Sequence, residues 1–240
     1  KNQQEKLIIN ERHEAWGSLA RKLAHEIKNP LTPIQLTIDR LKSKYSSQLS
    51  EKDKDKFKEN LRIINNQIKQ IEKLVNEFSD FARMPKPIFQ KNDLTELIIE
   101  NIKLLQELET SIEIKFESNL PIINLESDKE QLSRVFLNLI KNSIESIQQK
   151  VQNDNNTNKK IDIELNDHDD HINLTIIDTG IGFENLKSNI KDILNPYFTT
   201  KKNGTGLGLS IVNKIINDHN GNIEFIPINN GAKIKIIFKR

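Results

Sequence analysis

A histidine, a carboxylate and an amide lie within five positions of one another in the stretch Ala24-His25-Glu26-Ile27-Lys28-Asn29-Pro30. Apolar residues recur every three or four positions around it, which predicts an amphipathic helix. His25 lies two positions from both Leu23 and Ile27, so on a helix it is turned by about 160° from each of them. We therefore expect the imidazole to face solvent, with Glu26 beside it and Asn29 one turn further on.

This trio is suited to nucleophilic chemistry. A neutral imidazole is a nucleophile near neutral pH, and a carboxylate bonded to one ring nitrogen raises the basicity of the other. An exposed histidine on a helix usually has no catalytic role, so His25 alone does not define a site. The rest of the chain has to decide.

A second group of polar residues follows more than a hundred positions later. Asn138 and Asn142 are four apart on a predicted helix, which places both amides on one face, and an amide oxygen is a hard ligand suited to Mg²⁺. Asp178-Thr179-Gly180-Ile181-Gly182 follows an apolar strand, so its carboxylate lies at a strand end, where it can accept a hydrogen bond from an amino group. Taken singly, the asparagines could be surface residues and the aspartate an ordinary strand exit.

Two further segments favour phosphate binding. Gly204-Thr205-Gly206-Leu207-Gly208-Leu209 directly precedes a predicted helix, where exposed amides at the positive helix end can cradle phosphates. It is not a Walker P-loop, because no Lys-Ser/Thr pair follows the last glycine, and alone it could be a lid or a turn. Just before it, in Pro196-Tyr197-Phe198-Thr199-Thr200-Lys201, either Lys201 or Lys202 could neutralise phosphate charge.

Composition excludes several classes of protein. The 240 residues include 36 Lys and Arg against 34 Asp and Glu, a formal charge of +2 that indicates no broad basic field for nucleic acid. There is no cysteine, which rules out a disulfide framework and a thiolate metal site. No apolar run approaches the roughly 18 residues of a membrane span, so we expect no membrane contact by this segment itself.

Two long helical patterns open the chain. The first carries apolar residues at three- or four-residue spacings from Trp16 to Tyr45, with Pro30 and Pro33 expected to bend it. A Ser50-to-Asp53 cap opens the second, whose apolar residues alternate at four and three as in a coiled-coil seam. A lone antiparallel hairpin leaves much of this seam wet, so we expect a second copy to complete a dimeric four-helix bundle. The apolar positions are Trp16, Ala20, Leu23, Ile27, Leu31, Ile34, Ile38, Leu41 and Tyr45, then Phe57, Leu61, Ile64, Ile68, Ile71, Val75, Phe78 and Ala82.

Met84-Pro85-Lys86-Pro87 ends the second helix and marks a domain boundary. Beyond it, α/β patterns predict a mixed sheet covered by helices. We expect capping boxes at Asp93 with Glu96 and at Ser127 with Glu130, and a polar loop over 153–160. The expected strands are 88–90, 112–116, 161–165 and 172–177 and a closing hairpin of 223–226 with 234–238, and the expected helices begin near 93, 127 and 208.

The segment His-Glu-Ile-Lys-Asn-Pro-Leu-Thr-Pro-Ile closely resembles the H-box of sensor histidine kinases. Trp16, Arg21, residues 30–36 and Phe78-Ser79-Asp80-Phe81-Ala82-Arg83-Met84-Pro85 look like those of NtrY-type nitrogen-regulation sensors. The resemblance implies that His25 is the phosphoacceptor, Glu26 its activating base and Asn29 the group that orients water during dephosphorylation of a partner.

The ordered motifs after residue 92 resemble the ATP-binding module shared by histidine kinases, gyrase, Hsp90 and MutL, which is an α/β sandwich. The resemblance implies Mg²⁺ on Asn142 with support from Asn138, where the hydrolysing relatives carry a glutamate base. Ala232 stands where Thr is usual, and Ser143 where Ala is typical. The implied ATP-binding residues are Asn138, Asn142, Asp178, Gly180, Gly182, Phe198, Lys201, Gly204, Thr205, Gly206, Leu207 and Gly208.

These resemblances imply an ATP-dependent kinase that phosphorylates His25 and passes the phosphoryl group to an aspartate of a response regulator, and that also dephosphorylates that regulator. They imply the cytoplasmic region of an inner-membrane bacterial sensor, with a phosphotransfer domain at 1–84 that begins with the end of a signalling helix at 1–14. A linker at 85–91 and a catalytic domain at 92–240 follow. Two alternatives are a nucleotide-binding dimeric scaffold without kinase activity and a hydrolysing ATPase.

Overall fold

The computed structural model describes residues 2–46, 48–82, 84–153, 158–183, 190–201 and 204–240, with backbone alone for residues 2–21, 51, 81, 153 and 191. Several sequence expectations fall outside the described residues or side chains: Trp16, Ala20, Arg21, Phe81, Arg83, Lys202 and positions 153–157 of the polar loop. The chain forms two compact units, Lys1–Pro85 with Lys201–Leu207, and Lys86–Thr200 with Gly208–Arg240.

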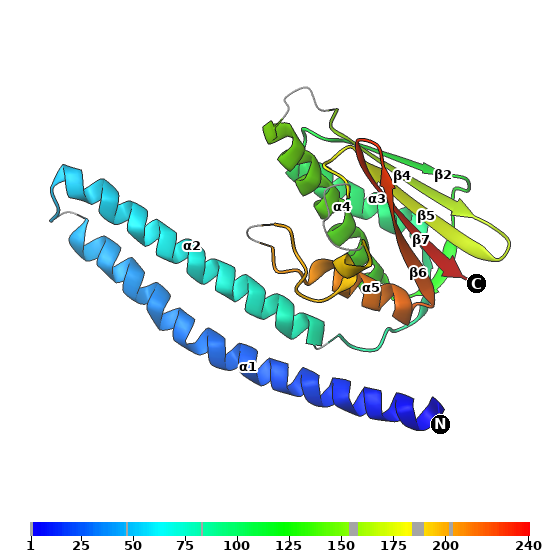
Figure 1. Ribbon diagram of the computed structural model, residues 1–240, viewed down its shortest axis with the longest axis horizontal. Helices are drawn as coiled ribbons and strands as arrows, with labels where there is room; N and C mark the ends of the chain where they lie inside the picture. Colours follow the sequence, from blue (N-terminus) through cyan, green and yellow to red (C-terminus); the bar gives the residue numbers. More distant parts are fainter. Residues whose placement is uncertain (1, 47, 83, 154–157, 184–189, 202–203) are drawn as a thin grey trace. The chain divides into compact units, whose positions relative to one another are not determined.

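The first unit is built on the predicted helical hairpin of α1 (Asn2–Tyr45) and α2 (Glu51–Ala82), seen in Figure 1. Ser50 caps α2 as expected, because its Oγ accepts from the backbone N–H of Asp53 at 3.3 Å and donates to that carboxylate at 2.6 Å. Pro30 and Pro33 lie inside α1, which follows a curved path.

The hairpin buries every seventh residue. Six side chains of the two helices are each no more than 7% exposed, while five apolar residues of the predicted stripes that lie between them remain 38–45% exposed. One prediction is corrected: Ala24, which is outside the predicted stripe, is buried, whereas Leu23 is 41% exposed. The buried set is Ala24, Leu31, Ile38, Leu61, Ile68 and Val75, and the exposed set includes Ile27, Ile34, Leu41, Ile64 and Ile71.

The second unit is the expected mixed sheet covered by helices (Figure 1). Its five strands run in the order β2-β4-β5-β7-β6, with β2 and β4 parallel and the other neighbours antiparallel. The strands are β2 (Glu113–Ser118), β4 (Lys160–Asp167), β5 (His171–Asp178), β6 (Gly221–Ile228) and β7 (Gly231–Lys239). The helices are α3 (Leu94–Leu108), α4 (Lys129–Asn153) and α5 (Gly208–Asp218), with a short 3₁₀ helix, η1 (Ile190–Leu194).

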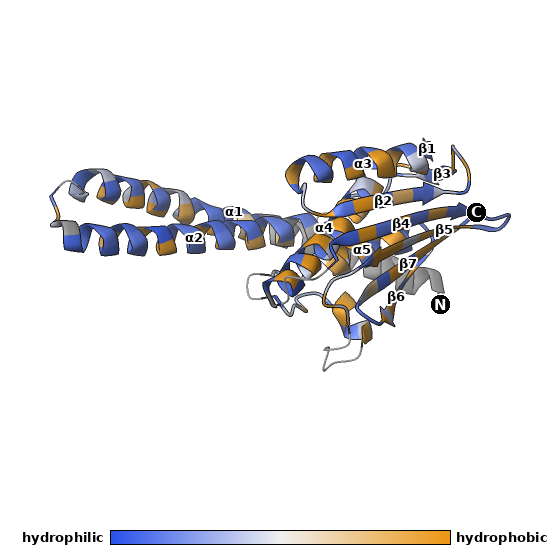
Figure 2. Ribbon diagram, turned by 90° about the horizontal axis from the view of Figure 1, so that it is seen from above, coloured by the Kyte–Doolittle hydropathy of each residue, from blue (hydrophilic) through white to orange (hydrophobic). Residues whose placement is uncertain are grey.

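The two faces of the sheet differ in polarity. Alternate residues of the central strands, such as Ile163, Ile176 and Ile234, are buried and face the helices. Their neighbours along the strands, among them Glu164 and Lys235, lie on the opposite face. Figure 2 shows this alternation of apolar and polar residues along the strands. The core therefore lies on the helix-covered face, which is also the face of the Asp178 side chain at the end of β5.

A second, two-stranded sheet corrects the expectations for residues 88–130. The strand expected at 88–90 is β1 (Gln90–Asp93), which pairs with β3 (Asn124–Ser127), a strand that the sequence analysis missed. Because Ser127 belongs to β3, the cap of α4 is Asp128, whose Oδ1 accepts from the backbone N–H of Gln131 at 3.0 Å. Asp93 caps α3 as expected, but it accepts from Thr95 N at 2.9 Å.

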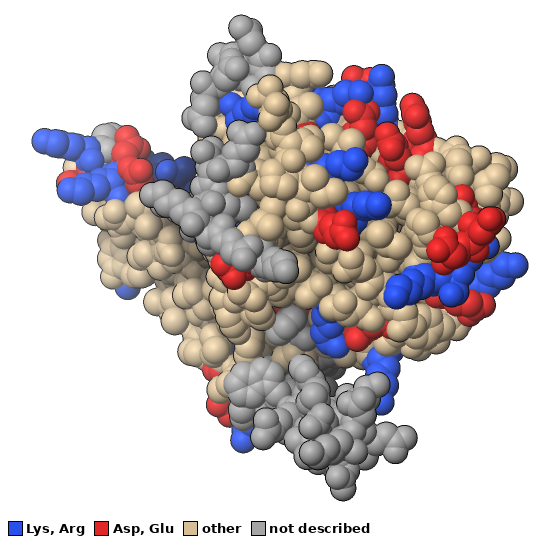
Figure 3. Space-filling view, turned by 45° about the vertical axis from the view of Figure 1, so that its right-hand side comes forward, with Lys and Arg blue, Asp and Glu red and all other residues tan. Residues whose placement is uncertain are grey.

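Basic and acidic side chains are interspersed on the face shown in Figure 3. This distribution fits the small formal charge of the chain. Among the described residues, none of the helices combines the length and the apolar character that crossing a bilayer requires.

The buried heptad positions predict a stability difference within α2. We expect Ile68→Ala to lower the free energy of unfolding by about 2–5 kcal/mol, because Ile68 is 4% exposed and its truncation leaves a cavity between the helices. Ile63→Ala is the matched control, since Ile63 is 50% exposed and belongs to neither apolar stripe. Urea unfolding followed by helical circular dichroism measures both, and equal losses would contradict the assigned seam.

Candidate functional site

The histidine trio is exposed on α1, as the sequence predicts. His25, Glu26 and Asn29 are all solvent-exposed, while Ala24 is 3% exposed and faces α2. The buried alanine fixes the rotation of the helix at this point, so the neighbouring imidazole is held on the outer surface. An attacking or accepting group can therefore reach this histidine from solvent.

Asp178 is the buried carboxylate of the sheet unit. It is 4% exposed at the end of β5, and two donors satisfy its oxygens. The backbone N–H of Gly180 donates to Oδ1 at 2.9 Å, and the Ser143 hydroxyl of α4 donates to Oδ2 at 2.9 Å. Such hydrogen bonds are what allow an ionised carboxylate to be buried.

Burial raises the pKa of Asp178 above its ordinary value. Hydrogen bonds from the backbone of Gly180, the hydroxyl of Ser143 and the backbone of Ala232 oppose this rise, as does the charge of Lys150. Lys150 comes from α4 and donates its ammonium to the Thr179 carbonyl at 3.0 Å. The carboxylate is thus held by donors from α4 and from the turn after β5, next to the start of β7.

The glycines after Asp178 allow the backbone to pass closely under α4 and β7. A Cβ atom at Gly180 would lie 2.1 Å from the Ser146 Oγ, and one at Gly182 would lie 2.4 Å from the Gly231 carbonyl oxygen. Gly182 also has φ +67°, in the left-handed region that favours glycine. Glycine is therefore required at both positions by space and not only by flexibility.

The two predicted amides lie on α4. Asn138 donates to the Arg134 carbonyl at 2.8 Å, and a Cβ atom at Gly208 would lie 3.2 Å from its Oδ1. The start of α5 therefore meets α4 at Asn138. Asn142 is half-buried one turn further on, immediately before the Ser143 that contacts Asp178.

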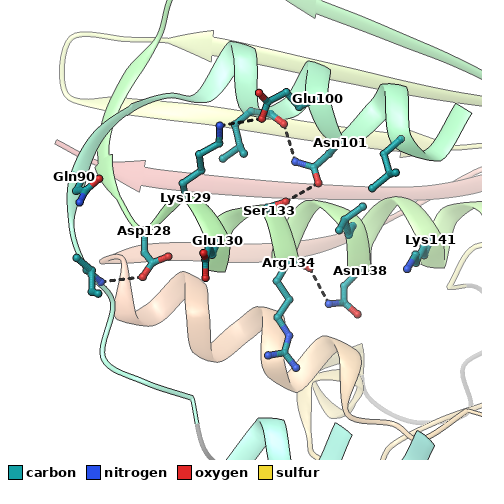
Figure 4. A pocket seen from close by; sticks show the side chains of 14 residues that line it. Gln90, Glu100, Asn101, Asp128, Lys129, Glu130, Ser133, Arg134, Asn138 and Lys141 are labelled. Carbon is teal, nitrogen blue, oxygen red and sulfur yellow. Dashed lines mark hydrogen bonds and ion pairs between the residues drawn. The ribbon is translucent and has the colours of Figure 1, made fainter. Parts of the chain in front are cut away.

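A cavity of about 920 Å³ lies between α3 and α4 and reaches Asn138 (Figure 4). Its lining combines aliphatic side chains, such as Leu97 and Leu104, with polar pairs: Asn101 accepts from the Ser133 hydroxyl at 2.8 Å, and Lys129 pairs with Glu100 at 3.0 Å. Asn142, Asp178 and the glycines do not line it. Of the predicted site residues, only Asn138 does, so this cavity does not define the predicted nucleotide site.

The remaining predicted residues lie in the segment before α5. Phe198 is half-buried, and its backbone N–H donates to the Asn195 carbonyl at 3.2 Å. Residues Lys201–Leu207 belong to the helical unit. Five predicted residues therefore belong to a different unit from Asp178: Lys201, Gly204, Thr205, Gly206 and Leu207. Within this segment Gly206 has φ +70°, and Leu207 is fully buried.

Ser143, Ser146 and Lys150 were missed as functional candidates. Ser146 accepts from the Ile181 backbone N–H at 3.0 Å, so α4 supplies side chains to each end of the turn after β5. The spacing of 143, 146 and 150 places all three on one helix face, which is a signal the sequence contained. In the sequence, Ser143 is distinguished only by standing where the related ATP-binding modules typically have Ala.

Two family models match the chain. Residues 15–87 match the His Kinase A (phospho-acceptor) domain. Residues 127–240 match the histidine kinase-, DNA gyrase B- and HSP90-like ATPase. The chain carries the two domains of a sensor histidine kinase core.

Similar proteins agree with this family. The nitrogen regulation protein NtrY of Azorhizobium caulinodans is 38% identical over 97% of this chain and 30% of its own length. A putative NtrY-like sensor histidine kinase of Rickettsia felis is 38% identical over 91% of this chain and 35% of its own. The chain thus spans about a third of the length of these relatives.

Solved histidine kinases share the fold. The histidine kinase ThkA in complex with response regulator protein TrrA has a TM-score of 0.65 at 28% identity, covering 99% of this chain and 66% of ThkA. Full-length ShkA in complex with AMPPNP has a TM-score of 0.67 at 18% identity, covering 92% of this chain and 45% of ShkA, and supports the fold alone.

The raised pKa of Asp178 predicts a pH dependence for nucleotide binding by this kinase core. The ionised carboxylate is the form that accepts from an amino group, so ADP affinity should fall as the pH drops through that raised pKa, above the range of an exposed aspartate. Calorimetric titration of the full chain with ADP at decreasing pH measures this.

Asp178→Asn is the matched control, because it keeps the shape but does not titrate. This variant binds ADP more weakly, and the pH dependence of its ADP affinity reports only the titration of the ADP phosphates. The difference between its pH profile and that of the wild type belongs to the Asp178 carboxylate. A wild-type profile parallel to that of Asp178→Asn would contradict the prediction.

Proposed function

We propose that this chain uses ATP to phosphorylate His25 and passes the phosphoryl group to an aspartate of a response regulator. One observation carries the proposal: an exposed His-Glu-x-x-Asn on a helical hairpin is joined in one chain to a buried Asp178 that is hydrogen-bonded to Ser143, the residue after Asn142. The nucleophile and the nucleotide site of a phosphotransferase are both accounted for. The family models that match the two segments support the same pairing.

The proposed nucleotide site recognises the adenine base. The carboxylate of Asp178 accepts from the 6-amino group of adenine, and the close backbone of Gly180 and Gly182 accommodates the flat ring. In the segment before and at the start of α5, backbone amides of Gly204, Gly206 and Gly208 bind phosphates. The other predicted ATP-binding residues of this region are Phe198, Lys201, Thr205 and Leu207.

The metal assignment rests on the donor set. Asn142 offers a half-buried amide oxygen, and Mg²⁺ is commonly held by few protein ligands plus phosphate oxygens and water. When bound, Mg²⁺ would neutralise charge on the phosphates. Among the described residues, no group of three or more His, Cys, Asp or Glu side chains could hold a metal ion.

Transfer then proceeds by in-line displacement. A ring nitrogen of His25 attacks the γ-phosphorus, the N–P bond forms as the bond to the β,γ-bridging oxygen breaks, and ADP leaves. Glu26 receives the proton of the other ring nitrogen, and Asn29 orients the water that later hydrolyses the partner's phosphoaspartate. The linker around Met84–Pro87, which has no helix or strand, serves as the hinge.

The apolar residues left exposed on the hairpin support a homodimer. Ile27, Ile34 and Leu41 of α1 and Ile64 and Ile71 of α2 form a second stripe that the hairpin does not bury. A second copy would cover it in a four-helix bundle. The proposed domains are 1–84 for dimerisation and phosphotransfer, 85–91 as linker and 92–240 for catalysis.

The partner and setting follow from the relatives. ThkA is solved in complex with the response regulator TrrA, which supports a receiver domain as the partner of this chain. The printed name of the NtrY relative supports a role in nitrogen regulation. The proposed setting is the cytoplasmic region of an inner-membrane sensor. Asn138 disfavours the alternative of a hydrolysing ATPase, because an amide that donates to the Arg134 carbonyl cannot act as a general base.

His25→Gln should abolish incorporation of label from γ-³²P-ATP, because glutamine is polar and of similar size but not nucleophilic. Acid-labile phosphate on the protein, measured after gel electrophoresis, is the readout. His168→Gln is the matched control, since His168 is also exposed and lies far along the chain in the loop after β4. Label retained by His25→Gln would refute the assignment, and release of free phosphate without labelling would favour the ATPase. ATP binding with neither outcome would favour the scaffold.

Asn29→Ala should leave autophosphorylation intact and slow dephosphorylation of the regulator by up to roughly 100-fold, the scale of losing a positioning group. The two rates are measured separately, with γ-³²P-ATP and with the prephosphorylated regulator. Lys28→Ala, on the same exposed turn, is the control. An equal loss of both activities in Asn29→Ala would contradict the division of roles.

A further inference from the structure

The Asp178 carboxylate accepts a hydrogen bond on each oxygen before any nucleotide arrives. Gly180 N–H donates to Oδ1, and the Ser143 hydroxyl donates to Oδ2. A carboxylate has about four acceptor positions, so each oxygen can accept once more. The orientation of the carboxylate decides which remaining acceptor site faces a nucleotide.

We propose that Ser143 is a positioning residue that holds the Asp178 carboxylate so that one of its remaining acceptor sites faces the amino group of the nucleobase. This inference rests on the proposed function, because it assumes that Asp178 binds adenine. Ser143 is 1% exposed, so water does not compete for its hydroxyl, and its hydrogen bond reaches the oxygen that Gly180 leaves unpaired.

The strand register explains why this hydroxyl comes from α4. Ala232 of β7 lies directly opposite Asp178, so the two side chains share the helix-covered face of the sheet. An alanine offers no side-chain donor there. The two departures noted in the sequence, Ala232 and Ser143, thus meet at one carboxylate, and the hydroxyl that the strand lacks is supplied by the helix.

Ser146 extends the same arrangement. One turn after Ser143, its Oγ accepts from the Ile181 N–H at 3.0 Å and lies where a Cβ atom at Gly180 would be. Asp178 and Ile181 are the two ends of one turn, and α4 binds each end through a serine. A loss of the Ser143 hydroxyl therefore releases the carboxylate while Ser146 keeps the turn in place.

The experiment compares two nucleotides on the full chain. Purine riboside triphosphate is ATP without the 6-amino group, so it cannot donate that hydrogen bond to the Asp178 carboxylate. We expect Ser143→Ala to weaken ATP binding about tenfold, the scale for a lost hydrogen bond to a charged group, and to leave the analogue within about twofold. Calorimetry or competition binding measures both dissociation constants. Equal weakening of ATP and the analogue, or no weakening of either, would overturn the proposal.

Two further variants keep the test decisive. Ser133→Ala is the matched control, because Ser133 is on the same helix and its hydroxyl donates to Asn101, away from Asp178. It should leave the ratio of the two affinities unchanged, and a changed ratio would overturn the proposal. Should Ser143→Ala fail to fold, Ser143→Cys retains the volume with a weak donor, and the same selective loss of ATP affinity is expected. A wild-type chain that binds neither nucleotide would refute the proposed function itself.

Discussion

A carboxylate buried at the end of a strand constrains the whole nucleotide-binding unit. Burial of the charge of Asp178 is unfavourable unless hydrogen bonds replace the lost water, and three elements surround the carboxylate. The turn after β5 must bend back to present Gly180, β7 must pair in a register that brings Ala232 alongside, and α4 must lie close enough for Ser143. The close contacts at Gly180 and Gly182 are consequences of the same requirement, because any side chain there would push α4 or β7 away.

The hairpin is governed by a different constraint, the division of its apolar residues between a set that the two helices bury and a set that stays exposed. With residues alternating at four and three, every second apolar position falls on a heptad and meets the other helix of the hairpin. The apolar residues between these positions point away from the other helix of the hairpin and stay exposed. The rotation that buries Ala24 also places His25 on the outside, so the packing of the hairpin and the accessibility of the histidine have one cause.

Periodicity and motif order predicted most of the architecture, and the errors are instructive. The two helices, the mixed sheet and the closing hairpin follow from patterns within single elements, where local spacing is sufficient. β3 and the shifted β1 were misread because their pairing is non-local, and the apparent cap at Ser127 was already committed to that pairing. The roles of Ser143 and Ser146 could not be weighed from sequence, because a serine on a helix has functional meaning only once its partner strand is known.

The burial of Asp178 and the packing of the hairpin together favour the proposed transfer of a phosphoryl group over hydrolysis of ATP. The α4 surface next to Asp178 presents amides and hydroxyls, and Asn138 is occupied in the helix, so none of these side chains can take a proton from water. In the proposed reaction the nucleophile is His25, which belongs to the other unit and has Glu26 as its neighbour in the sequence. Because His25 and Asp178 belong to separate units, the rate of the proposed phosphorylation would depend on how often the two residues meet through the nucleotide. A change in the hairpin or the linker would then alter this rate without altering the surroundings of Asp178.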